Sequence, residues 1–267
     1  MKTIERTFNG FMYYCGKRLA DLFSYTGGLA VLLGKTVFFM FSSRPRKAEI
    51  LEQLDRVGVA SLPIVLLSSL FTGMVLALQS AYQMQKVSAE MYIASLVALS
   101  LTRELGPVLT ALIVAGRCGA AITAEVGTMK VTEQIEAPET LSANPVQYLV
   151  VPRFAALIIM LPLLTVCADF FGILGGYIVG VGKLNITHAI YQKMTFYPLS
   201  IKDVMTGLFK SFSFAVIICT IACYEGINSC GGAEGVGKAT TSSVVRSFIL
   251  IIVADCFFTA LFYFIGR

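Results

Sequence analysis

The residues best suited to bind a charged group are Arg103 and Glu104, which are adjacent inside a long apolar stretch. A charged side chain at the centre of a membrane span costs at least about 2.5–3.5 kcal/mol, so such residues face protein or a water-filled cavity. Gly106 and Pro107 follow and loosen the helix. An arginine here can bind a phosphate while the glutamate shapes the local field. The alternative is an ion pair that only holds two helices together.

Catalytic side chains and metal ligands are scarce. His188 is the only histidine and lies in a predicted outer loop, so Ser-His and Cys-His chemistry lack a base. The 7 cysteines include no Cys-x-x-Cys pair, which disfavours a zinc or iron–sulfur site. We therefore predict no catalytic residue, no metal and no cofactor, and a membrane enzyme acting on lipid is poorly supported.

One segment imitates a nucleotide-binding loop. Gly232, Gly237 and Lys238 have the spacing of a P-loop, but Ala239 occupies the position of the magnesium-binding hydroxyl. The motif also needs a preceding buried strand, whereas this segment lies between two apolar stretches. We predict that the chain binds no nucleotide.

The composition indicates a membrane protein. Of 267 residues, 56% are hydrophobic and 14% are charged, with a mean hydropathy of +0.77. Soluble domains carry roughly 45–50% apolar and about 25% charged residues. The net charge of +5 is too dispersed to favour a nucleic-acid partner.

Five stretches are long enough to cross a bilayer, which takes about 20 apolar residues in a helix. We predict an all-α, polytopic membrane protein, with a tilt or bend near Pro162 in its third span. The predicted spans are Val57–Gln79, Tyr92–Gly116, Leu149–Val181, Gly207–Tyr224 and Val244–Ile265.

An earlier apolar stretch, Leu19–Phe41, allows two interpretations. It is either a sixth span or an interfacial helix whose Lys35 side chain extends toward the head groups. Basic residues flank both of its ends, which favours the interfacial helix.

The distribution of basic residues sets the orientation. With five spans, the inner segments hold 14 Lys and Arg and the outer segments hold 5. By the positive-inside rule, the N-terminus is cytoplasmic and the C-terminus lies outside. No cleavable signal is evident at the start. We predict one membrane domain over 1–267, in which 1–56 holds the tail, the interfacial helix and a basic linker, and 57–267 holds the transmembrane core.

The most helix-like polar segment runs from Glu125 to Glu136, between the second and third spans. It is either a solvated loop helix or a helix that docks on a cytoplasmic partner. Pro138 should end it, because the residue before proline avoids the α region. We predict a coupling helix over about 124–137.

Several ordered motifs resemble the MlaE family of permeases. The similarity runs from about Leu54 to the C-terminus. It is carried by Leu99–Leu112, Ala115–Ala121, Ala124–Met129, Thr132–Ile135, Asn144-Pro145, Val151–Arg153 and Gly235–Thr241.

The resemblance implies the architecture and the partners. Such permeases are homodimers, with an interfacial elbow helix and five spans per subunit. They work with a cytoplasmic ABC ATPase and a periplasmic MCE-domain lipid-binding protein. They sit in the bacterial inner membrane and move phospholipid between the inner and outer membranes, which maintains outer-membrane lipid asymmetry.

The resemblance also implies site residues. Arg103, Glu104 and Leu105 would lie at a lipid cavity, and Leu78 and Tyr82 are weaker candidates for it. The residues expected to couple to the ATPase are Glu125, Met129, Thr132 and Glu133. One departure from the family pattern is Pro138, which puts the end of the coupling helix in question.

The main alternative function is an ion-coupled secondary transporter or channel-like protein. It would use Glu104, Asp169 or Glu225 as proton or ion sites. We see no inverted repeat with paired broken helices, which such transporters often contain. Otherwise, Asp169, Lys210, Glu225 and Asp255 are interpreted as structural or interfacial charges.

Overall fold

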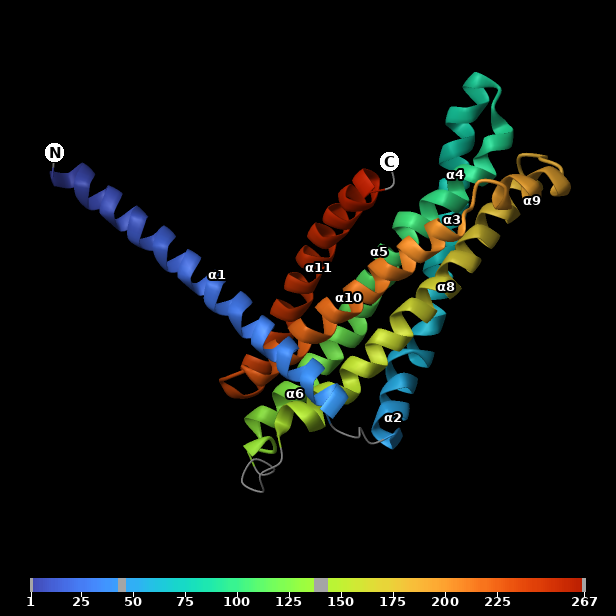
Figure 1. Cartoon of the computed structure of the whole chain (residues 1–267). Coiled ribbons are helices and arrows are strands. Elements are labelled where there is room, and N and C mark those ends of the chain that lie inside the picture. The colour runs from blue at the N-terminus through green and yellow to red at the C-terminus, as the bar shows by residue number, and fades with distance from the viewer. Residues whose placement is uncertain (1, 43–46, 137–143, 266–267) are drawn as a thin grey trace.

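The computed structural model describes residues 2–42, 47–136 and 144–265, and over these ranges the chain is helical with no strand. Figure 1 shows long helices that lie side by side, joined by short turns. Six helical stretches are long and apolar enough to cross a membrane. They are Gly16–Ser42, Ala48–Met84, Glu90–Val131, Val146–Gly182, Ile201–Ile227 and Gly232–Phe264. The all-α polytopic prediction is confirmed.

The five stretches from Ala48 onward correspond in order to the five predicted spans and are numbered from one to five. The helices run further than the apolar residues do, because helical hydrogen bonding continues into the polar flanks. The first stretch contains α2 (Lys47–Val57), the short helix η1 (Val59–Ser61) and α3 (Leu62–Met84). The fourth is α10 (Ile201–Ile227) and the fifth is α11 (Gly232–Ile265).

The second stretch is one continuous rod that contains two π-helical segments. Its parts are η3 (Glu90–Tyr92), α4 (Ile93–Ser100), η4 (Leu101–Leu105), α5 (Gly106–Val114), η5 (Ala115–Gly119) and α6 (Ala120–Val131). The third stretch begins with η6 (Val146–Val150) and continues as α8 (Val151–Gly182). Helix α8 is unbroken at Pro162, the position predicted to tilt or bend it.

Helices α3 and α8 approach each other so closely that their backbones touch. A methyl group added to Gly73 would lie 1.8 Å from the carbonyl oxygen of Gly172, and one added to Gly175 would lie 2.1 Å from that of Leu70. Only glycine allows backbones to approach this far, as is common between membrane helices. Helix α10 packs against α6, α8 and α11 and fills the middle of the bundle.

The short helix α9 (His188–Phe196) closes the end of the bundle opposite α6 (Figure 1). Its Tyr191 side chain is buried against Gly180 of α8, where an added methyl group would lie 2.2 Å from the ring. Burial raises the pKa of the Tyr191 phenol to about 12.

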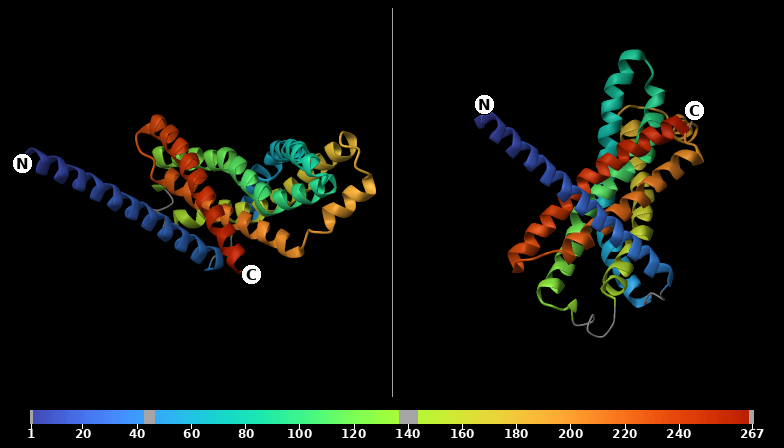
Figure 2. Two further views of the ribbon diagram at one scale, coloured as in Figure 1. Left: turned by 90° about the horizontal axis from the view of Figure 1, so that it is seen from above. Right: turned by 60° about the vertical axis from the view of Figure 1, so that its left-hand side comes forward.

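Helix α1 (Lys2–Ser42) contains the predicted interfacial stretch and behaves differently from the others. Figures 1 and 2 show it crossing the other long helices at a steep angle, with its N-terminal part extending away from them. It packs on η6, α8 and α10. The ring of Tyr25 meets that of Tyr224 edge-on at 5.2 Å, and the Arg246 guanidinium lies 4.2 Å above Tyr25.

Candidate functional site

The π-helical segment η4 ends directly before Gly106 and Pro107, and Pro107 has no backbone N–H to donate to the preceding turn. The backbone N–H of Gly106 bonds the carbonyl of Leu101, five residues earlier, which widens the helix by one residue. The carbonyl of Thr102 faces α10 at Gly207, where an added methyl group would lie 2.3 Å from it. Such π-helical insertions occur frequently at functional sites. This one carries Arg103 and Glu104.

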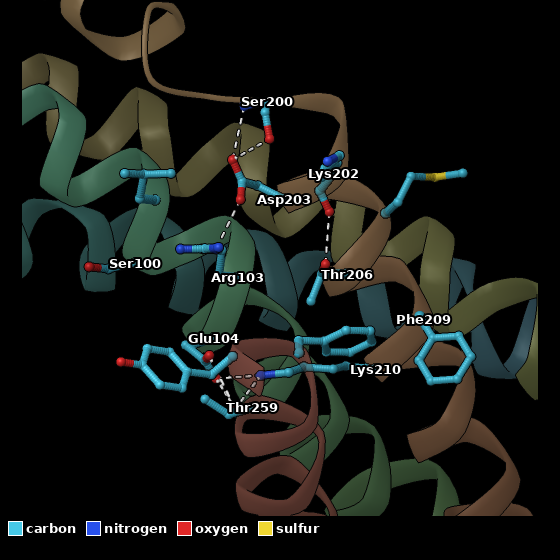
Figure 3. Close-up of a pocket in the computed structure, with 14 residues that line it drawn as sticks. Ser100, Arg103, Glu104, Ser200, Lys202, Asp203, Thr206, Phe209, Lys210 and Thr259 are labelled. Atoms are coloured by element: carbon cyan, nitrogen blue, oxygen red, sulfur yellow. Dashed lines mark hydrogen bonds and ion pairs between the residues drawn. The ribbon is translucent and has the colours of Figure 1, made fainter. Parts of the chain in front are cut away.

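Both side chains line a pocket of about 840 Å³ between η4, α10 and α11 (Figure 3). Its walls combine charged groups with aromatic and aliphatic side chains. The lining residues are Leu99, Ser100, Arg103, Glu104, Ser200, Lys202, Asp203, Met205, Thr206, Phe209, Lys210, Thr259, Phe262 and Tyr263.

Arg103 is held by the start of α10. Its Nε lies 2.9 Å from Oδ1 of Asp203. The other carboxylate oxygen of Asp203 accepts hydrogen bonds from the backbone N–H and the hydroxyl of Ser200, both at 2.9 Å. This capping box fixes Asp203, because the same carboxylate completes the helix N-terminus. The Arg103 side chain lines the pocket and remains 56% exposed.

Glu104 is held by a fully buried lysine. The Nζ of Lys210 lies 2.5 Å from Oε2 of Glu104 and 2.9 Å from Oδ1 of Asp255, and its side chain is 0% exposed. It also donates to the hydroxyl of Thr259 at 2.8 Å. A buried ammonium group needs such partners, because an uncompensated charge in the interior is costly. The network joins η4, α10 and α11 at mid-bundle.

Arg103 and Glu104 therefore do not pair with each other. Each forms an ion pair with α10, so their charges hold helices together and line the pocket at the same time. The sequence analysis missed Asp203, although Ser200-x-x-Asp203 is a recognisable capping signal. Lys210 and Asp255, interpreted as structural charges, do form ion pairs, and Lys210 also lines the pocket.

The other three residues expected at the lipid cavity do not line this pocket. Leu105 faces the opposite side of η4 and packs on the apolar cluster that contains Ala77 and Ile93. Leu78 and Tyr82 lie on the exposed face of α3, where Lys86 sits 4.4 Å above the Tyr82 ring. Within the described residues, the structure brings together Arg103 and Glu104 but not these three.

The segment that imitates a P-loop has a different conformation. Residues from Gly232 to Thr240 form the first turns of α11. A phosphate-binding loop must wrap around its ligand with free backbone N–H groups, which a regular helix uses internally.

Comparison with known proteins agrees with the motifs. The model of the family described as "Permease MlaE" matches residues 50–261. The chain belongs to the MlaE permease family. A probable ABC transporter permease protein of Rickettsia typhi is 51% identical over 214 residues, which are 80% of this chain and 83% of the relative.

Two further relatives extend the match. A probable ABC transporter permease protein of Synechocystis is 40% identical over 232 residues, which are 87% of this chain and 88% of the relative. The intermembrane phospholipid transport system permease protein MlaE of Haemophilus influenzae is 37% identical over 264 residues, covering 96% of this chain and 98% of that protein. The chain is thus a multi-pass transport permease of the MlaE family.

In this MlaE-family permease, Glu125 is engaged inside the chain. Its carboxylate lies 3.0 Å from Nη2 of Arg153, whose side chain is 7% exposed, and 3.5 Å from Nη1 of Arg56. Arg153 also donates to the carbonyl of Leu149 at 2.6 Å. Met129 borders the same small hollow. Glu125 therefore links α2, α6 and α8.

The predicted coupling helix ends earlier than expected. Helix α6 stops at Val131, and the predicted end near 137 lies beyond the turn that follows. The hydroxyl of Thr132 donates to the carbonyl of Thr128 at 2.8 Å, and Glu133 adopts a positive φ of 59°. A residue in the left-handed conformation ends a helix, which explains why α6 stops before the predicted boundary. Thr132 and Glu133 lie exposed at this tip, whereas Pro138 falls outside the described residues.

Proposed function

We propose that this permease moves phospholipid and that the pocket beside η4 receives the lipid. A phospholipid needs apolar walls for its acyl chains and a cationic group near its phosphate. Arg103 provides that group, since Asp203 holds its Nε while more than half of the side chain stays exposed in the pocket lining. Phe209 and Phe262 supply apolar wall. The observation that supports the proposal best is this pairing of an anchored arginine with an apolar wall.

A second copy of the chain completes this pocket in our proposal. The pocket lies open on a face where α10 and α11 expose large apolar side chains. Polar groups such as Glu104 and Thr259 reach the same face, and contact with lipid tails would leave them poorly solvated. A homodimer related by a two-fold axis would place two such pockets together. The family resemblance implies the same assembly.

The energy for transport comes from partner subunits in this proposal. The chain resembles permeases that work with a cytoplasmic ABC ATPase and a periplasmic MCE-domain protein. The exposed tip at Thr132 and Glu133 is available for the ATPase, whereas Glu125 is already paired with Arg153. We therefore assign docking to the tip and an internal structural role to Glu125.

We place the permease in the inner membrane with a cytoplasmic N-terminus and a periplasmic C-terminus. The asymmetry of basic residues supports this orientation. Helix α1 crosses the other helices steeply, which favours an interfacial elbow over a sixth span. The ion-coupled alternative is less favoured, because two of its three candidate sites, Glu104 and Glu225, are paired with Lys210 and Arg246.

Photocrosslinking tests the lipid site. A photoreactive residue at Thr206, inside the pocket, should give phospholipid adducts that decrease strongly when Arg103 is replaced by Gln. The matched control is Phe212, on the same helix but outside the pocket lining, where bulk lipid should crosslink equally in both backgrounds. Adducts at 206 that do not depend on Arg103 would exclude this lipid site.

A further inference from the structure

Asp169 differs from the other carboxylates near η4. Glu104 and Asp255 share Lys210, and Asp203 pairs with Arg103. Asp169, on α8, forms no ion pair within the described residues. Its Oδ1 is buried and has no hydrogen-bond partner there. A lone carboxylate at this depth would be costly, so the unpaired oxygen needs an explanation.

The carboxyl group of Asp169 lies directly against the end of the π-helical segment. A methyl group added to Gly106 would lie 1.8 Å from Oδ1 of Asp169 and 2.9 Å from the carbonyl oxygen of Leu101. Both oxygens therefore lie where the side chain of any other residue at position 106 would begin, so only glycine fits there. That carbonyl already accepts the N–H of Gly106 and has a second lone pair.

The two oxygens lie within 1.8 Å and 2.9 Å of the same point beside Gly106, and two unprotonated oxygens so placed would repel each other. We propose that Asp169 is a neutral carboxylic acid that donates its O–H to the Leu101 carbonyl, and that this bond positions η4. A neutral acid avoids the cost of a buried charge and satisfies the unpaired oxygen. Asp169 is thus a positioning residue that acts through the backbone of η4.

Contacts on both sides of η4 complete the argument. The carbonyl of Thr102 abuts α10 at Gly207, and the side chain of Leu101 packs on Gly172 of α8. The segment η4 is therefore held between α8 and α10, with Asp169 supplying the polar contact on the α8 side. This fixes the direction in which Arg103 and Glu104 leave the helix. The functional part of the inference rests on the proposed lipid function, whereas the protonation of Asp169 does not.

Infrared difference spectroscopy of the full-length chain in lipid tests the protonation. The C=O stretch of a carboxylic acid should disappear in Asp169→Asn. It should persist in Asp255→Asn, because that carboxylate pairs with Lys210. A band that survives Asp169→Asn, or that is lost with Asp255→Asn, would overturn the assignment. This measurement needs no transport, so its failure is distinct from a failure of the proposed function.

Transport by the reconstituted complex tests the positioning. Asp169→Asn should retain transport, because its amide N–H can replace the acid O–H, whereas Asp169→Leu should lose most of it. Gly106→Ala should also lose most of it, because the added methyl group expels the carboxyl group. The matched control is Gly116→Ala in the same rod, where the nearest atom would be 3.7 Å away. Normal transport by Asp169→Leu would show that Asp169 does not position the site.

Discussion

Replacing Lys210 with Met should be among the most destabilising single changes in this permease. Methionine keeps much of the volume but removes the positive charge, and it leaves Glu104 and Asp255 facing each other in the bundle. Breaking a buried ion pair by removing one partner costs about 3–5 kcal/mol. Lys210 is fully buried and contacts both carboxylates, so we expect a loss in this range.

The comparison variants separate charge from packing. Lys202→Met, on the same helix and in the same pocket but exposed, should change the free energy of unfolding by less than about 0.5 kcal/mol. Lys210→Met combined with Glu104→Gln and Asp255→Asn should recover most of the loss, because no uncompensated charge remains.

The assay is the denaturant dependence of unfolding in detergent or lipid. We expect the midpoint to fall sharply for Lys210→Met and to stay near the parent for Lys202→Met. If Lys210→Met unfolds at the same midpoint as the parent, the buried network contributes nothing and our account of it is wrong.

Three further outcomes follow from the same structure. Glu125→Lys should destabilise the chain by about 3–5 kcal/mol, since the new ammonium group would face the buried guanidinium of Arg153. Glu133→Lys should leave the free energy of unfolding unchanged and weaken co-purification of the ATPase. Tyr191→Phe should be neutral or stabilising in thermal unfolding, because the buried phenol oxygen has no hydrogen-bond partner within the described residues; a loss above about 1 kcal/mol would contradict this. Cysteine labelling should reach Ser88 only from outside and Lys238 only from the cytoplasm, and the reverse pattern would refute the orientation.

The sequence was sufficient to predict the helices that cross the bundle. Apolar length is a local property, so each predicted span overlaps an observed helix. The ends were less predictable, as α6 shows. Nothing local indicates that Glu133 takes a left-handed conformation, which is uncommon for a residue other than glycine. The helix consequently ends at Val131, before the predicted boundary.

The site was predictable only in part, for a geometric reason. Two adjacent charges in an apolar stretch identified Arg103 and Glu104 without any structure. Successive residues in a helix point about 100° apart, so Leu105 points about 200° from Arg103 and faces the other side of the helix. Their partners Asp203 and Lys210 lie on another helix about a hundred residues later, and only tertiary packing shows which charges meet.

The glycine contacts between α3 and α8 also constrain how this permease can move. Where Gly73 lies against Gly172 and Gly175 against Leu70, backbone meets backbone with no side chain to rotate aside. Sliding one helix along the other would drive Cα atoms into carbonyl oxygens, so the two helices move as one rigid body. Helices α10 and α11 meet instead through side chains such as Phe209 and Phe258, whose rings can re-pack. Opening and closing of the pocket during a transport cycle should therefore occur as a movement of α11 against α10, while α3 and α8 stay fixed relative to each other.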